Sequence, residues 1–176
     1  KIIYSRKKFN ELHNNCAGKH LAMLTSCLYN NYNITNYLDF NHPHQKNIRT
    51  VFNKFTETKL SKKNFSLDGC SAPQYSFRIK SISKALNNLI KCYNSSFEYS
   101  IAARILINST LKYPNYIGGT KSFDTKVIDY SKSKIFCKHG AEGVFLFAHL
   151  KKGISGVVKV TDGNERAIPI LSLIHI

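Results

Sequence analysis

The sequence predicts an α+β fold in which helices come first and an antiparallel meander closes the chain. Apolar residues recur at helical spacing in several segments before residue 130, whereas residues 135–160 contain runs rich in β-branched and aromatic residues. Helical and extended segments do not alternate, so the pattern lacks the βαβ repeat of a parallel sheet. With 176 residues, 43% of them hydrophobic, the chain is long enough for one domain with its own core.

Two helices are expected in the first third of the chain. Asn14 or Asn15 can cap a helix that begins near Cys16. Its apolar residues repeat at helical spacing, as Leu21, Leu24 and Leu28. The second helix carries an apolar stripe of Ile48, Val51, Phe52 and Phe55. We interpret His42 and His44, at the start of this helix, as loop-surface residues and assign them no role.

The middle of the chain is expected to hold two strands, a turn and two scaffold helices. Residues 65–67 run in extended form into Asp68-Gly69-Cys70, where Gly69 permits a sharp turn. An edge strand is predicted over residues 75–79. Amphipathic helices are predicted over residues 81–93 and 97–111.

The first of these scaffold helices contains Ser81-Ile82-Ser83-Lys84, which matches the Ser-x-x-Lys pattern of serine acyl enzymes. So short a pattern arises by chance in a chain rich in serine and lysine. A structural role for Ser81 and Lys84 is therefore favoured over a catalytic one.

The last third is expected to hold a short helix followed by strands. Gly118-Gly119 forms a loop that a ligand can approach closely, and Ser122 can cap a helix that reaches residue 128. Asp124 is either a first-turn acid that matches the helix dipole, which the sequence favours, or a substrate-facing carboxylate. The strands are predicted over residues 135–137, 144–150 and 154–160.

The charge balance favours no nucleic-acid or membrane partner. Lysine and arginine outnumber acids 26 to 10, but they are spread along the chain in ones and twos. No apolar run approaches the roughly 20 residues that cross a bilayer. The five cysteines are an odd number in a chain too large to need disulfides, so reduced thiols and a cytoplasmic location are expected.

Both ends of the sequence look cut. The chain starts with lysine, and residues 171–176 form an apolar tail without a polar end. We therefore expect a further segment upstream, and residues 1–176 to be one partial domain. The authenticity of the last residues stays open.

The densest chemistry lies in the segment His13-Asn14-Asn15-Cys16-Ala17-Gly18-Lys19-His20. Cys16, Lys19 and His20 have the i, i+3, i+4 spacing that places side chains on one helix face. A helix N-terminus also favours the thiolate form of a cysteine. Two thiols and one nitrogen ligand suffice for a zinc site with an open position, so Cys70 is the expected partner of Cys16.

The third ligand is open on ligand chemistry alone. His20 is the generic choice, because lysine must lose its proton before it can bind a metal. A set of Cys16, Cys70 and Lys19 is possible only if the metal holds the amine neutral. The spacing is not that of a zinc finger, because the chain has no paired Cys-x-x-Cys knuckles.

Lys138 is a second candidate for chemistry. It follows an apolar run and precedes Gly140, an arrangement similar to the Lys-Thr-Gly strand of penicillin-recognising enzymes. There the amine works beside a nucleophilic serine, and the glycine leaves room for substrate. A surface lysine at a strand end is the commoner explanation of this short match.

Taken together, these motifs resemble the asparaginase II family, the class 3 or rhizobial-type L-asparaginases. They follow the family's order and span almost the whole chain. The segments that carry the resemblance are His13–His20, Asp68-Gly69-Cys70, Gly118-Gly119 with Phe123-Asp124-Thr125, Lys138–Val144, and Asp162-Gly163 with Arg166-Ala167.

The resemblance implies a fold like that of serine β-lactamases and penicillin-binding proteins, of which this chain would hold a part. It implies hydrolysis of L-asparagine to L-aspartate and ammonia by a homodimer. The residues at the family's zinc positions are Cys16, Lys19 and Cys70. By this pattern the third ligand is Lys19 and not His20. Lys138 matches the lysine of a Ser-Lys pair, and Asp68 and His20 match residues beside the metal.

The family's nucleophilic serines lie upstream of the Cys16 motif, so the chain alone is expected to be inactive. Ser5-Arg6-Lys7-Lys8 fits the Ser-x-x-Lys spacing but lies too close to Cys16. Two rival functions stay open at this point. One is a zinc hydrolase that needs no serine, and the other is a basic nucleic-acid-binding module without catalysis.

Overall fold

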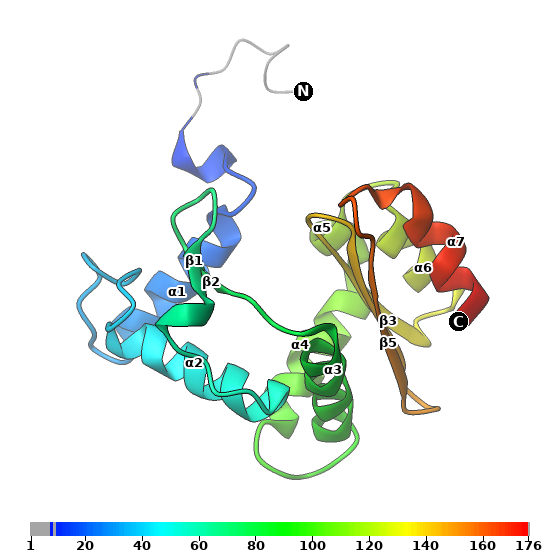
Figure 1. The fold of residues 1–176 in the computed structure, drawn as a ribbon, viewed down its shortest axis with the longest axis horizontal. Helices are drawn as coiled ribbons and strands as arrows, with labels where there is room; N and C mark the ends of the chain where they lie inside the picture. The colour runs from blue at the N-terminus through cyan, green and yellow to red at the C-terminus, as the bar shows by residue number, and fades with distance from the viewer. Residues whose placement is uncertain (1–7, 9, 176) are drawn as a thin grey trace. The chain divides into compact units, whose positions relative to one another are not determined.

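The computed structural model describes residue 8 and residues 10–175 (Figure 1). The chain forms two compact units, each described by itself. The N-terminal unit comprises the residues up to Asn53 together with Lys59–Ser76. The C-terminal unit comprises Lys54–Thr58 and the chain from Phe77 onward. Both helices and antiparallel strands are present, so the predicted α+β class is confirmed.

The N-terminal unit consists of helices and one small hairpin. Its elements are η2 (Glu11–His13), α1 (Ala17–Tyr29), α2 (Pro43–Thr56), η3 (Lys62–Asn64), β1 (Phe65–Leu67) and β2 (Pro73–Tyr75); α2 continues into the first residues of the C-terminal unit. The hairpin is antiparallel, with Phe65 opposite Tyr75 and Leu67 opposite Pro73. This register makes residues 68–72 the loop of the hairpin. The short strand β1 confirms the extended segment expected at residues 65–67.

The interior of the N-terminal unit contains polar residues that were predicted from the sequence to lie on its surface. His42 and His44 are 4% and 7% exposed, so their prediction as loop-surface residues was wrong. His42 accepts a hydrogen bond from the backbone N–H of His44, and its Nε2 lies 2.9 Å from the Asn33 carbonyl. His44 Nδ1 lies 3.2 Å from Ser26 Oγ on α1. These contacts satisfy both ring nitrogens of His42 and Nδ1 of His44, whereas His44 Nε2 is buried without a hydrogen-bond partner among the described residues.

The predicted strand at residues 75–79 is shorter and earlier in the structure. The ladder of β2 ends at Tyr75, and Arg78 is the extended N-cap of the next helix. That helix begins at Ile79. Residues 75–79 therefore contain the end of strand β2 and the first residue of the next helix.

The C-terminal unit is built around a three-stranded antiparallel sheet. Its elements are α3 (Ile79–Tyr93), α4 (Ser100–Lys112), α5 (Pro114–Gly118), α6 (Phe123–Tyr130), β3 (Ile135–Gly140), β4 (Val144–His149), β5 (Ile154–Lys159), η4 (Glu165–Ala167) and α7 (Ile168–His175). The strand order is β3-β4-β5, as the meander pattern predicted.

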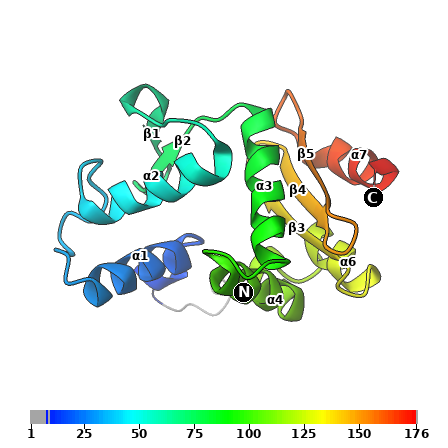
Figure 2. The same ribbon diagram turned by 90° about the horizontal axis from the view of Figure 1, so that it is seen from below.

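Helices cover both faces of this sheet, with α3 on one side and α7 on the other (Figure 2). One core cluster joins Cys137 and Phe145 of the sheet to Ile128 of α6 and Ile168 of α7. The other cluster joins alternate sheet residues to α3 and α4, and comprises Leu86, Ile90, Ile107, Phe136, Ala148 and Leu150. The period-two alternation of the strands therefore supplies two cores, one for each face.

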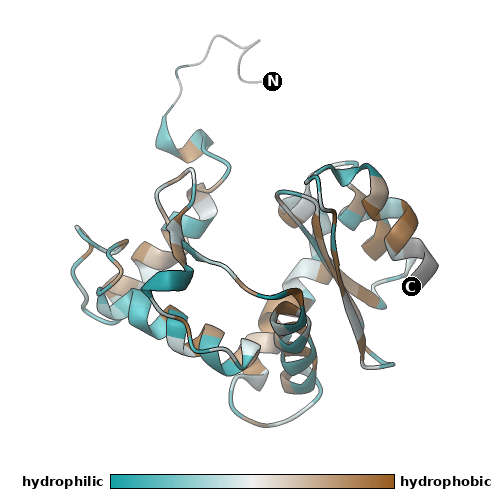
Figure 3. Ribbon diagram, viewed as in Figure 1, coloured by the Kyte–Doolittle hydropathy of each residue, from teal (hydrophilic) through white to brown (hydrophobic). Residues whose placement is uncertain are grey.

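The last helix, α7, was not predicted as a helix. Ile168 and Ser172 lie one turn apart and are 1% and 0% exposed. The Ser172 hydroxyl donates to the Ile168 carbonyl at 2.6 Å. Hydrophobic residues colour much of this helix brown in Figure 3. An apolar segment that had been interpreted as a tail is thus a helix that covers one face of the sheet.

Among the described residues, no helix combines the length and the apolar character that crossing a bilayer requires.

Candidate metal centre

The start of α1 supplies the first half of the site. Cys16 is the N-cap residue of this helix, and its backbone N–H donates to Asn14 Oδ1 at 2.7 Å. Its thiol caps no backbone N–H of the helix, which leaves the sulfur available for a tertiary contact. Lys19 and His20 follow within the first turn, as the helical spacing predicted.

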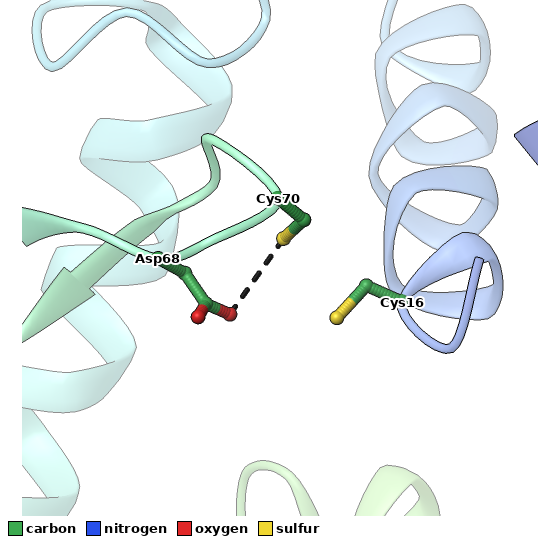
Figure 4. Close-up of side chains that lie close together, drawn as sticks. All are labelled: Cys16, Asp68 and Cys70. Atoms are coloured by element: carbon green, nitrogen blue, oxygen red, sulfur yellow. Dashed lines mark hydrogen bonds between the residues drawn. The ribbon is translucent and has the colours of Figure 1, made fainter.

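The β1–β2 loop supplies the second half. The Asp68 backbone N–H donates to the Ala72 carbonyl at 2.9 Å, and that of Ser71 donates to the Asp68 carbonyl at 2.8 Å. Asp68 Oδ1 accepts from the Gly69 N–H at 2.8 Å, and the Cys70 thiol lies 3.6 Å from Asp68 Oδ2. This compact loop orients the Asp68 and Cys70 side chains toward the same space (Figure 4).

The two halves meet within the N-terminal unit. The sulfurs of Cys16 and Cys70 and a carboxylate oxygen of Asp68 all lie within 4.8 Å of one another. Lys19 Nζ donates to Asp68 Oδ2 at 2.7 Å, so the amine lies beside the same group. Two sulfurs with an oxygen and a nitrogen nearby are a donor set that suits zinc.

The thiols differ in acidity. The Ala72 backbone N–H and the His20 side chain donate to the Cys70 sulfur and lower the pKa of Cys70 to about 7. The pKa of Cys16 is raised, mainly because this thiol donates to Cys70. The pKa shifts of the two thiols therefore have opposite signs, and Cys70 is the thiol that ionises nearer neutral pH.

Lys19 and Asp68 form an ion pair beside the two thiols. Burial lowers the pKa of Lys19, but hydrogen bonds to Asp68 and Cys70 outweigh it and leave the pKa above its ordinary value. The hydrogen bond from Lys19 in turn lowers the pKa of Asp68. Lys19 must give up both its proton and this pairing to bind a metal, whereas Asp68 is already a carboxylate.

His20 contacts a residue that lies outside both sequence motifs of the site. Its Nδ1 lies 2.6 Å from the Tyr37 hydroxyl, and the two rings meet edge to face at 5.9 Å. Tyr37 was not predicted as a site residue, because it lies in a polar, turn-rich loop without a motif. Tyr37, His20 and Cys70 line a cavity of about 440 Å³, whose remaining walls include Leu21 and Leu24.

Lys138 lies in the C-terminal unit, on β3 opposite Leu146. It is half-buried, and its ammonium donates to the carbonyl of His139. Ser122 caps α6 as predicted, through a hydrogen bond from the Thr125 N–H.

Asp124 connects α6 to the strand that carries Lys138. It lies in the first turn of the helix, as the favoured interpretation had it, but is only 3% exposed. One carboxylate oxygen accepts from the Ser122 hydroxyl at 2.6 Å, and the other accepts from the His139 N–H at 3.3 Å. Burial raises the pKa of Asp124, but the hydrogen bonds from Ser122 and His139 and the charge of Lys138 outweigh it and bring the pKa below its ordinary value.

The glycine at position 118 makes room for this carboxylate. A Cβ atom at Gly118 would lie 2.2 Å from Asp124 Oδ1 and 2.6 Å from Ser122 Oγ. The close approach that the sequence predicted at Gly118-Gly119 is therefore made, in this structure, by the chain's own Asp124.

The Ser81–Lys84 motif has structural partners within the C-terminal unit. Lys84 forms an ion pair with Glu57, and the Ser81 hydroxyl accepts a hydrogen bond from Thr58 Oγ1 at 2.9 Å. These contacts agree with the structural role that the sequence favoured. Ser5, the other serine with this spacing, lies outside the described residues.

Comparison with known families gives one match. A family model described as L-asparaginase II matches residues 1–175, which includes both units and every motif discussed above. A comparison with curated proteins finds no significant match.

Proposed function

The chain belongs to the L-asparaginase II family, and from that premise we propose that it serves the hydrolysis of L-asparagine to L-aspartate and ammonia. Membership implies an amidohydrolase with a small-molecule substrate. The finer assignments below concern the metal, the proton-transfer residue and the assembly.

The metal assignment is that Cys16, Cys70 and Lys19 hold a zinc ion. Its support is the convergence of the two sulfurs with the amine beside them, and the ready ionisation of Cys70. When bound, zinc would orient the substrate as a Lewis acid, or it would order the pocket wall. Asp68 is the alternative third ligand, because its oxygen already lies within reach of both sulfurs.

The proton-transfer assignment is Lys138. Amide hydrolysis needs a nucleophile, a base that takes its proton and an acid that protonates the leaving ammonia. In the family's pattern the nucleophile is a serine N-terminal to the Cys16 motif. Neutral Lys138 takes the proton of that serine as the serine oxygen attacks the side-chain amide carbon, and gives a proton to the nitrogen that leaves as ammonia. Water then hydrolyses the acyl-enzyme to release L-aspartate and the free serine. Support comes from its position on a strand that Asp124 and the sheet hold in place.

The fold and assembly assignments follow the same family. We assign the C-terminal unit to a serine β-lactamase-like fold, supported by its antiparallel sheet with helices on both faces. The working enzyme is assigned as a homodimer in which residues 1–176 form one partial domain.

The observation that carries the proposal is the meeting of Cys16 and Cys70 in a chain that matches this family. The test is ammonia release from L-asparagine by the intact protein and its Lys138→Ala variant. We expect at least a ~100-fold loss of turnover, as for removal of a general acid–base group. Lys159→Ala is the matched control, because Lys159 also lies on a strand and donates to the carbonyl of its following residue.

Unchanged turnover in the Lys138→Ala variant would contradict the role of this lysine. If ammonia release were lost on chelation while a variant without the upstream serine stayed active, the rival zinc hydrolase without a serine nucleophile would be favoured.

A further inference from the structure

A series of side-chain contacts connects the interior of the N-terminal unit to the cavity that Cys70 lines. Gln45 on α2 is 1% exposed, and its Nε2 donates to the Tyr37 carbonyl at 2.9 Å. The Tyr37 hydroxyl lies 2.6 Å from His20 Nδ1. Tyr37, His20 and Cys70 line one cavity, in which the His20 side chain helps to lower the pKa of Cys70. Each contact comes from a different segment, and two of the residues, Tyr37 and Gln45, lie outside every ligand motif.

The direction of these hydrogen bonds follows from the chemistry of the partners. A neutral imidazole has one N–H donor and one acceptor nitrogen. Because Tyr37 occupies Nδ1, the other ring nitrogen is the one available to the Cys70 sulfur. A neutral ring that donates to the sulfur has an acceptor at Nδ1, to which the Tyr37 hydroxyl donates. Tyr37 thereby fixes both the tautomer and the orientation of the ring.

We propose that Tyr37 is a positioning residue of the metal centre, acting through His20 on the Cys70 ligand. This inference rests on the proposed zinc site. Tyr37 itself binds no metal; it holds the imidazole that donates to a ligand sulfur, so that the sulfur keeps a fixed direction. Without the hydroxyl, His20 is free to change tautomer or rotate into the adjoining cavity of about 440 Å³.

The surroundings of Tyr37 make this role specific to one residue. The loop before α2 is held at two points, by Gln45 at Tyr37 and by His42 Nε2 at the Asn33 carbonyl. Tyr32, in the same loop, also has a hydroxyl with a partner, but that partner is the exposed amide of Asn47 at 3.3 Å. Tyr32 therefore offers a matched control with the same chemistry and no link to His20.

The experiment measures zinc affinity by competition with a chromophoric chelator and records the thiolate-to-metal absorption of the Co²⁺-loaded protein. We expect Tyr37→Phe to weaken zinc binding about tenfold, as loss of an outer-shell partner does, and to shift the Co²⁺ spectrum. Tyr32→Phe should match the wild type in both. A structural role alone would not change the cobalt spectrum of a folded variant.

A double-mutant cycle with His20→Ala tests the route. If Tyr37 acts through His20, Tyr37→Phe should have no further effect on zinc affinity in the His20→Ala background. Wild-type affinity and spectrum in Tyr37→Phe, or an equal loss in both backgrounds, would overturn this inference alone. Failure of the wild-type protein to bind zinc would overturn the proposed metal site and this inference with it.

Discussion

The two units present reactive groups in contrasting ways. In the N-terminal unit, the thiols lie on a helix start and a hairpin loop, and polar side chains connect these two short segments. In the C-terminal unit, Lys138 lies on a strand of a sheet that has a hydrophobic core on each face. A metal would thus add a direct crosslink to the first site, whereas the second is already fixed by packing.

This contrast has an energetic consequence. A ligand that binds only the folded protein adds to the free energy of unfolding, by about 2.7 kcal/mol at a concentration 100 times its dissociation constant. That gain should concentrate in the N-terminal unit, where few apolar contacts hold the site. Changes around Asp124 should instead affect the C-terminal unit and leave metal affinity unchanged.

The largest expected effect is that of Cys70→Ser on zinc affinity. Loss of a thiolate ligand should weaken binding by about 100-fold or more, beyond the effect of losing an outer-shell partner. Competition with a chromophoric chelator measures the change. Cys92→Ser is the control, because Cys92 is a partly buried free thiol in the C-terminal unit. Equal zinc affinities of Cys70→Ser and Cys92→Ser would contradict the proposal that Cys70 is a zinc ligand and that Cys92 is not.

The next effect is that of Asp124→Asn on stability. The amide cannot accept from Ser122 and His139 as the carboxylate does, so we expect a loss of about 1–3 kcal/mol in the free energy of unfolding. Urea unfolding measures it. Asp129→Asn, an exposed change in the same helix, should stay within about 0.5 kcal/mol. If Asp124→Asn lowered the zinc affinity and left the free energy of unfolding unchanged, the contrast between the two units would be contradicted.

The smallest expected effect is the pH dependence of the difference in unfolding free energy between the wild type and Asp124→Asn. The pKa of Asp124 is lower in the folded protein than its ordinary value of 3.8. Its ionised form therefore stabilises the fold fully above about pH 4, and this stabilisation is lost as the pH falls through the folded-state pKa. Urea unfolding between pH 6 and 3 should show a steeper loss in the wild type than in Asp124→Asn. Parallel curves would argue against a lowered pKa.

Elements with a clear period were predictable from sequence, and those with mixed signals were not. The helices α1 to α4 and the three strands of the large sheet were located from apolar spacing alone. The short stretch around Tyr75 was misassigned because apolar residues there belong to a strand end and then to a helix start. His42 and His44 were misplaced because a histidine beside a proline gives no sign of what its ring nitrogens will meet.

The candidate site was predictable only where its residues share a motif. Helical spacing brings Cys16, Lys19 and His20 together, because i, i+3 and i+4 positions share a face. Tyr37 had no such signal, since its contact with His20 spans 17 residues and depends on how a polar loop folds. Such contacts come from tertiary structure, which local patterns do not encode.

X-ray absorption at the zinc edge of the metal-loaded protein measures whether both sulfurs bind one zinc ion. We expect two sulfur neighbours at about 2.3 Å together with lighter nitrogen or oxygen neighbours. Cys70→Ser should reduce the sulfur count to one. A zinc ion surrounded only by nitrogen and oxygen in the wild-type protein would contradict the account.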